Sequence, residues 1–300
     1  TGYSSNLQIA FSQTSDLDND IDTSNIIDGK PIYYWQNIQD KTVPSDAGYL
    51  VLSNCTRIIA KDLTVQAVIL ASTSNSTLTN ITIENEGDTG ILLASSSQNI
   101  ISNCSLRLNT RGFQLKDSEY NTITRCTIAC YRGINLDHSN FNVFSNNNFA
   151  GSKFAVEHYD ISTLPFKEAI STGNVFYENT FAQCETALTI SVNYTIHNNY
   201  FTGNRQAVVF LRGNNNLTGN NFTVNQQAIY LDGADNTLRD NHIDNNDKSL
   251  VIGGLELFRN YLGYVPPVIY SNDIDDSNTV NGKPIYFWTD VKDKTVPNDA

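Results

Sequence analysis

The side chains best suited to chemistry stand next to a break in an otherwise regular spacing of the sequence. Glu157 and His158 directly precede a stretch of about eleven extra residues, and Arg132 lies one sequence period upstream. A histidine can carry a proton, and an arginine can act as a base or neutralise an acidic sugar. These three residues are candidates for catalysis in a sugar-binding groove. We favour the alternative, in which His158 is a satisfied, half-buried residue at a distorted coil, and therefore assign no catalytic residue.

Metal ligands do not gather in the sequence. His138, His197 and His242 fall at different positions of the period, so they form no ligand cluster. Carboxylates near the last coils could bind a hard cation, namely Asp232, Asp235, Asp240, Asp244 and Asp247. No run matches an EF-hand or a glycine-rich calcium repeat. We predict no metal site and no cofactor, favour solvated turns for these aspartates, and leave Ca²⁺ binding open.

The five cysteines do not form a disulfide framework in a chain of 300 residues. Cys104 and Cys126 fall at the same inward position of successive repeats. Stacked strands lie about 4.8 Å apart, which exceeds the usual Cβ separation of about 3.8 Å in a disulfide. We therefore predict reduced thiols in the core.

The elements that must position all these residues are short strands in a repeat of about 21 residues. Nine octets align, and in each the third and eighth residues are apolar. About five residues later comes a small residue, followed by alternating apolar residues, which indicates strands. The octets begin at Thr56, Ser76, Asn99, Asn121, Asn142, Asn174, Tyr194, Asn215 and Asn236.

The sixth octet position identifies the kind of solenoid. In five successive octets it is an asparagine, and stacked parallel strands allow each amide to donate to the next. These asparagines are Asn147, Asn179, Asn199, Asn220 and Asn241. Such short repeats bury a core only by stacking on their neighbours. We predict an all-β fold, a right-handed parallel β-helix of about ten coils of 20–23 residues.

A longer repeat divides the chain into modules. Residues 19–47 return as residues 272–300 at an offset of 253, with 19 of 29 positions identical. We call these segments the first and second leader. The predicted organisation is an N-terminal segment (1–18), the first leader, a β-helix (48–252), a linker or cap (253–271) and the second leader, which begins the next module. The chain is then a piece of a longer protein or takes its missing continuation from a neighbour.

Each leader carries an aromatic triplet after a Gly-Lys-Pro turn, suited to covering an open solenoid end or filling a junction. These predicted assembly residues are Tyr33, Tyr34 and Trp35, and Tyr286, Phe287 and Trp288.

Composition limits the partners. A net charge of −12 and a pI of about 4.6 argue against nucleic acid. No run is long and apolar enough for a membrane span. Seven N-glycosylation sequons occur, about the number expected by chance, but none falls in an inward column, so each could face solvent. They are Asn54, Asn75, Asn80, Asn103, Asn193, Asn216 and Asn221.

Repeats such as NTITRCTIACYRGINLDHSN and NNLTGNNFTVNQQAIYLDGADN resemble NosD-like parallel β-helix repeats. The segment IDGKPIYYWQNIQDKTVPSDAGYLVLSNCTRIIAKDLTV, followed by such coils, resembles tandem modules of archaeal cell-surface proteins. The resemblance covers residues 19–252 and 272–300 and implies the β-helix fold. It also implies a range of roles, from pectinolytic lyases and tailspikes to a copper-maturation protein. Polygalacturonase signatures and methionine are absent here, so the resemblance assigns this chain neither a polygalacturonase activity nor a copper role.

The function we favour is a structural, extracellular or cell-surface protein whose modules assemble end to end into a filament or surface layer. Its partners would be copies of itself or adjacent modules. The alternatives are a carbohydrate-binding module and a polysaccharide lyase or hydrolase acting on surface glycans. An enzyme is the less favoured class, because no facing acid/base pair is identified.

Overall fold

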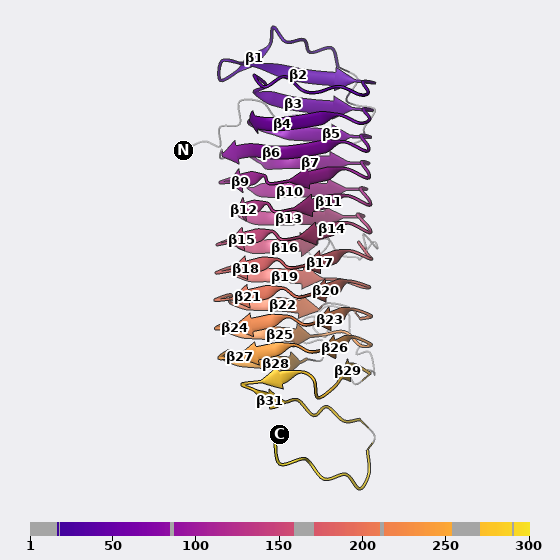
Figure 1. The fold of residues 1–300 in the computed structure, drawn as a ribbon, viewed down its shortest axis with the longest axis vertical. Helices are drawn as coiled ribbons and strands as arrows, with labels where there is room; N and C mark the ends of the chain where they lie inside the picture. Colours follow the sequence, from indigo (N-terminus) through magenta and orange to yellow (C-terminus); the bar gives the residue numbers. More distant parts are fainter. Residues whose placement is uncertain are drawn as a thin grey trace, which may run out of the picture.

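The chain folds as a β-solenoid, as predicted (Figure 1). The computed structural model describes residue 17 and residues 19–84, 87–158, 171–210, 213–253, 271–289 and 291–300. Within these ranges all regular elements longer than a single residue are strands. Most of the predicted N-terminal segment, most of the predicted linker at 253–271, and the insertion after His158 lie outside the described residues.

One side of the rod is a sheet of twelve strands, parallel except for β1, which pairs antiparallel with β2. From β2 onward, one strand comes from each coil. The strands are β1 (Ile26–Ile27), β2 (Lys30–Gln36), β3 (Tyr49–Ser53), β5 (Val68–Ala71), β7 (Thr89–Ala94), β10 (Arg111–Lys116), β13 (Arg132–Asp137), β16 (Phe154–His158), β19 (Thr186–Ile190), β22 (Gln206–Phe210), β25 (Gln227–Leu231) and β28 (Lys248–Ile252).

The other side of each coil is formed by shorter strands, which in most coils are two three-residue strands on either side of a bend. They are β4 (Ile59–Thr64), β6 (Thr77–Glu84), β8 (Ile100–Ser102), β9 (Ser105–Arg107), β11 (Thr122–Thr124), β12 (Thr127–Ala129), β14 (Val143–Ser145), β15 (Asn148–Ala150), β17 (Val175–Tyr177), β18 (Thr180–Ala182), β20 (Thr195–His197), β21 (Tyr200–Thr202), β23 (Asn216–Thr218), β24 (Asn221–Thr223), β26 (Thr237–Arg239), β27 (His242–Asp244), β29 (Asp273–Ile274), β30 (Thr279–Val280) and β31 (Lys283–Pro284).

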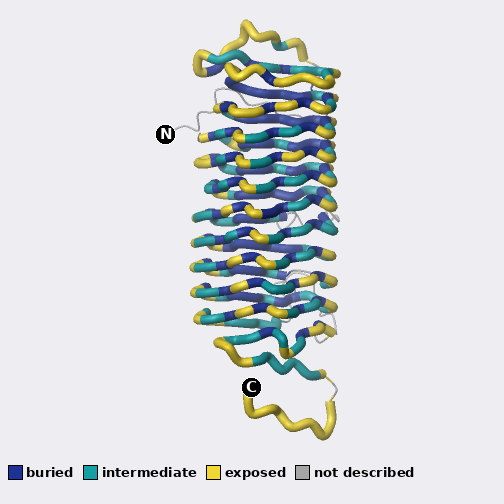
Figure 2. Tube along the Cα trace, viewed as in Figure 1, coloured by how far each residue is buried: buried dark blue, intermediate teal, exposed yellow. Residues whose placement is uncertain are grey.

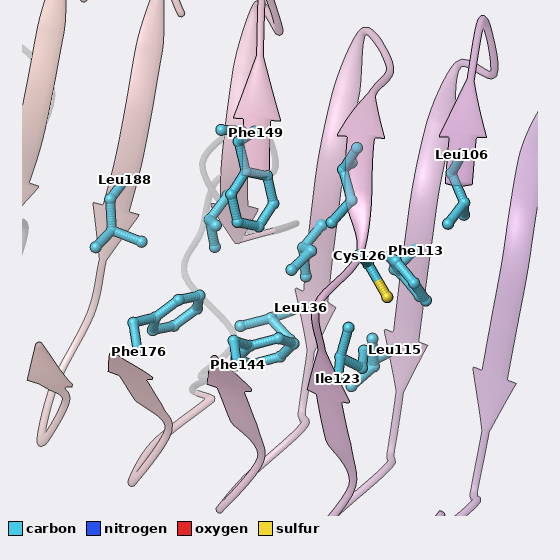
Figure 3. Packing of buried hydrophobic residues seen from close by; sticks show 14 of the residues in the cluster. Leu106, Phe113, Leu115, Ile123, Cys126, Leu136, Phe144, Phe149, Phe176 and Leu188 are labelled. Atoms are coloured by element: carbon cyan, nitrogen blue, oxygen red, sulfur yellow. The ribbon is translucent and has the colours of Figure 1, made fainter. Parts of the chain in front are cut away.

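The apolar octet positions form the core. In the third-position column Phe144 pairs with Phe176, and their rings stack at 4.6 Å. In the eighth-position column the rings of Phe181 and Phe201 stack at 4.8 Å. Figure 3 shows how side chains from opposite walls of the coil meet between the sheets. Each fully buried large apolar side chain contributes roughly 1.5–3 kcal/mol to the stability of the fold. Each coil adds one layer of such side chains to the core.

The predicted register is wrong at the first octet. Ile59 pairs with Thr77, the second residue of the octet at Ser76, so the first octet begins at Ile58 and not at Thr56. The first coil is shorter still, since Ile32 pairs with Tyr49. A shift of two positions keeps the same side chains facing inward, so apolar alternation could not distinguish the two registers. The coils at this end are therefore shorter than predicted.

The asparagines of the sixth octet position form the predicted ladder at the bend between the two short strands. Each Nδ2 donates to the next Oδ1 over 2.8–3.1 Å, and the ladder extends one coil beyond the prediction, from Asn147 to Asn278. Each Oδ1 also accepts a backbone N–H of the previous coil, as Asn199 does from Asn179 at 2.9 Å. Each Nδ2 also donates to a backbone carbonyl, here that of Phe176 at 2.9 Å. At the bend, backbone N–H and C=O groups cannot pair with those of neighbouring strands. The asparagine side chains supply their hydrogen-bond partners instead.

Three further polar ladders were not predicted. A second asparagine ladder follows the first octet position from Asn99 to Asn174 and resumes from Asn215 to Asn272. A third joins Asn204, Asn225 and Asn246. A ladder of hydroxyls runs from Thr73 to Ser171, with each hydroxyl accepting a backbone N–H. Along these parts of the rod, the corners of the coil are held by side chains that lie directly above one another.

Replacing one ladder asparagine tests this account. Asn199→Ala leaves the Asn179 amides and the Phe176 carbonyl buried without partners, and we expect a loss of roughly 3 kcal/mol in the free energy of unfolding. Asn221→Ala is the matched control, because Asn221 is exposed on the next coil, and should cost less than about 0.5 kcal/mol. Urea denaturation followed by circular dichroism measures both. Equal losses for the two variants would contradict the ladder's role.

Candidate functional site

The structure brings Arg132 and Glu157 together on the outside of neighbouring coils. They lie on β13 and β16, and Arg132 Nε forms an ion pair with Glu157 Oε2 at 2.5 Å. The Arg132 guanidinium and the Lys153 ammonium both lie over the rings of Tyr131 and Phe154, at 5.3–5.7 Å from the ring centroids. We call Tyr131, Arg132, Lys153 and Phe154 the cation–aromatic cluster. Glu157 neutralises the charge of Arg132 in this cluster, and Tyr131 remains 47% exposed.

His158 is not part of this outward cluster. Successive side chains of a strand point to opposite faces, so His158 points inward where Glu157 points outward, and only 5% of it is exposed. Its strand neighbour in the column is Leu136. Glu157 and His158 therefore point to opposite faces of the sheet and do not share one groove. Tyr159 and Asp160 lie outside the described residues.

The partner of His158 is a tyrosine that occupies an asparagine position. Tyr194 stands in the ladder between Asn174 and Asn215. Asn174 Nδ2 donates to the Tyr194 hydroxyl at 3.1 Å, and this hydroxyl lies 3.1 Å from His158 Nε2. Burial lowers the pKa of His158 to about 4, against a smaller opposing effect of the Thr189 backbone. The imidazole is therefore neutral at physiological pH, and its Nε2 can accept a hydrogen bond from the Tyr194 hydroxyl.

This pair reflects two linked departures from the repeat. A tyrosine replaces a ladder asparagine, and a histidine replaces an aliphatic core residue where it can accept the new hydroxyl. Sequence inspection placed His158 in its aliphatic column, but it did not connect His158 with Tyr194, which is 36 residues away. Tyr194 interrupts a column of asparagines at the first octet position, and this exception was the sequence signal that could have revealed the pair.

The predicted cysteine arrangement is found. All five cysteines are free and buried. Burial raises the pKa of Cys130 to about 12 and that of Cys184 to about 11. Such thiols are inert, because the thiolate is the reactive form.

The sequon asparagines lie on the surface, and two aspartates of the last coils lie in turns. All seven sequon asparagines are exposed, which meets the geometric condition for modification; modification itself stays a prediction. Asp235 and Asp240 adopt left-handed turn conformations, with φ of 58° and 52°. In the part of the chain that the structure describes, no three His, Cys, Asp or Glu side chains group as metal ligands.

The two leaders have the same local fold. The hydroxyl of Tyr33 donates to Asp46 at 2.9 Å, and that of Tyr286 donates to Asp299 at 3.0 Å. The same lysine lies over the same tryptophan in each copy, with distances to the ring centroid of 6.0 Å for Lys41 and 5.0 Å for Lys294. The hairpin of β1 and β2 returns as that of β30 and β31.

The aromatic triplets lie at the two ends of the rod. Tyr33 and Trp35 pack on the end of the core, whereas Tyr34 faces outward and donates to the Leu17 carbonyl at 2.7 Å. Phe287 packs against the other end of the core, and Tyr286 and Trp288 contact each other with ring centroids 5.7 Å apart. In Figure 2 the last segment of the second leader is exposed along its length.

The second leader continues the coils that precede it. β29 and β30 pair in parallel with β26 and β27. Asn236 Nδ2 donates to Asn272 Oδ1 at 2.9 Å, and Asn241 Nδ2 donates to Asn278 Oδ1 at 2.8 Å. Both asparagine ladders therefore continue from the last coil into the second leader.

Comparison with known proteins agrees with this architecture. A model of the family described as periplasmic copper-binding protein (NosD) matches residues 17–186, more than half of the chain. The chain belongs to the NosD family. A model described as right-handed β-helix region matches residues 165–299 of this NosD-family chain. No curated protein sequence matches significantly.

Solved structures share the fold of this NosD-family chain at low identity. A double mutant of the tailspike protein of E. coli bacteriophage HK620 has a TM-score of 0.57 at 12% identity, covering 84% of this chain and 56% of the tailspike. An exopolygalacturonase from Thermotoga maritima has a TM-score of 0.53 at 8% identity, covering 82% and 85%. A GH87 α-1,3-glucanase catalytic domain bound to nigerose has a TM-score of 0.50 at 14% identity, covering 71% and 53%. The chain thus spans about half the length of the tailspike and glucanase structures.

The copper named in the family description does not fit the described residues. Copper binds imidazole or soft sulfur ligands, but the sequence has no methionine. The cysteines are buried in the core, and His158 is committed to Tyr194. We derive no copper chemistry for this NosD-family chain.

The depressed pKa of His158 predicts an acid-sensitive step in stability. The folded pKa is about 4 and the unfolded value about 6.5, so the unfolded chain takes up the proton first and stability falls as the pH drops from 6.5 to 4. The loss from this residue reaches roughly 3 kcal/mol. His158→Leu combined with Tyr194→Asn restores the residue types of both columns and should remove that loss.

Denaturation midpoints measured between pH 4 and 7 check this expectation. His242→Gln is the control, because His242 is exposed, and it should keep the acid-sensitive step. An unchanged pH dependence in the double variant would show that His158 is not its source.

Proposed function

We propose that this chain is a structural tandem-module protein outside the cytoplasm, at the cell surface, and that its modules stack end to end into one continuous solenoid. The observation that carries the proposal is the passage of both asparagine ladders from Asn236 and Asn241 into the second leader. The second leader begins one module and at the same time pairs with the last coil of the module before it, so it would join the two modules. Its aromatic residues pack against the open end of the core, which an isolated solenoid must cover.

Several features support this role and location. The family description names a periplasmic protein, and all seven sequon asparagines are exposed. The net charge of −12 keeps a long, strand-rich rod soluble. In the described ranges no helix has the length and apolarity of a membrane span. Partners are then other copies of the module.

A second candidate function is binding of an acidic glycan at the cation–aromatic cluster. The specific observation is the exposed Tyr131 ring beside two cations. Aromatic rings and basic groups suit a carboxylated sugar. The tailspike of E. coli bacteriophage HK620, a structure with the same fold and 12% identity, is known in complex with a pentasaccharide. Glycan binding that is lost in Tyr131→Ala would favour this candidate.

End-to-end stacking sets a length that can be measured. Strands β2 to β28 give one module eleven parallel rungs in the first sheet, and at about 4.8 Å a rung the axial repeat is about 53 Å. Electron micrographs of the native particle should show filaments, or rows in a layer, with this repeat. A compact particle without an axial repeat would contradict the proposal.

A further inference from the structure

The same leader has different surroundings at the two ends of the rod. In the second leader Asn272 and Asn278 are buried, with 5% and 0% exposed, because the last coil covers them. In the first leader the equivalent Asn19 and Asn25 are exposed. Ile26 is 65% exposed, whereas its equivalent Thr279 is half-buried by pairing with His242. The first leader thus exposes the face that the second leader buries.

Hydrogen bonding at the two leaders differs in the same way. Asn25 and Asn278 both turn Nδ2 back to an aspartate carbonyl, that of Asp22 at 3.1 Å and that of Asp275 at 3.0 Å. Asn278 Oδ1 accepts the backbone and side-chain amides of Asn241 at 3.2 and 2.8 Å. Within the described residues no donor reaches Asn25 Oδ1. The acceptor that Asn278 uses for the ladder is therefore open on its first-leader equivalent, Asn25.

Charge and shape at this end are also complementary to the last coil. Arg239 on β26 binds Asp273 and forms an ion pair with Asp275 at 2.9 Å. The first-leader equivalents of these aspartates are Asp20 and Asp22, and both are exposed. A cavity of about 450 Å³, lined by residues 19–21, 34–36 and 38, lies beside them.

The burial of an equivalent isoleucine also differs between the two leaders. Ile21 lines the cavity and is only half-buried. Its second-leader equivalent, Ile274, is 4% exposed because it pairs with Leu238 inside the rod. Among the described residues, Ile21 has no partner strand residue in the place that Leu238 takes beside Ile274.

We propose that the first leader is the docking surface for the last coil, residues 236–253, of a second copy of this module, in the register that the second leader shows. Arg239 of the docked copy pairs with Asp20 and Asp22, its Leu238 covers Ile21, and its Asn241 donates to Asn25. The inference rests on the proposed end-to-end stacking and specifies the contact. In an isolated chain the second leader occupies the last coil, so it acts as a cap that a second copy must displace.

Releasing this cap in the full chain tests the proposal. Ile274→Asp with Asn278→Ala removes the apolar and ladder contacts of the second leader and leaves the first leader intact. In sedimentation velocity the weight-average mass should rise at least about twofold at about 0.1 mM protein, through mass action. Asn278→Ala alone is the milder variant and should shift the mass in the same direction. Circular dichroism verifies that the β signal is kept.

The matched control makes the equivalent substitutions in the first leader. Ile21→Asp with Asn25→Ala, added to the released chain, should return it to monomers. The register is checked in the released chain with Ile26→Cys and His242→Cys, which a short bis-maleimide reagent should cross-link between chains, since Thr279, the equivalent of Ile26, pairs with His242.

Released chains that stay monomeric with a native β signal would overturn the docking surface. Oligomers that persist after the first-leader substitutions, or that give no cross-link between positions 26 and 242, would overturn it as well. Neither result bears on the axial repeat of the native particle, which tests end-to-end stacking separately.

Discussion

The structure depends on side-chain amides that satisfy the backbone where the coil bends. A strand pairs its backbone groups with the coils on either side, but a bend interrupts this pairing. At the bend beside the sixth octet position each asparagine accepts a backbone N–H from one coil and donates to a carbonyl of the same stack. Because buried, unpaired backbone groups are costly, the bend holds only if successive asparagines lie directly over one another. This requirement fixes the register of the core.

The same requirement gives the rod a direction. Each amide donates to the next coil along the sequence, and Asn241 donates in this way to Asn278 of the second leader. The equivalent residue of the first leader, Asn25, is exposed and offers the same acceptor at the opposite end of the rod. Two unlike ends that match each other favour open, head-to-tail growth over a closed dimer. The internal duplication shows such a contact within one chain, and the function proposed for the protein follows from that contact rather than from a catalytic site.

The region around His158 shows how a reactive residue type can serve packing. His158 lies in the core as a neutral acceptor for Tyr194, and its pKa is low because it is buried. The nearby charges of Arg132 and Glu157 neutralise each other on the outer face. A shared β-helix fold with glycan-processing proteins therefore says little about activity here, because activity depends on outward side chains that each member of the fold class arranges separately.

The sequence by itself determined the solenoid, the apolar columns and the ladder from Asn147 to Asn241, because a repeat of about 21 residues places equivalent side chains over one another. It also determined that the leader is duplicated. Only the tertiary structure decided the register of the first coil, since a shift of two positions preserves alternation. Only the tertiary structure paired His158 with Tyr194, because the two residues are 36 positions apart in the sequence. Only it buried Asn278 while exposing Asn25, because a coil lies against the second leader and none of the described residues lies in that place against the first.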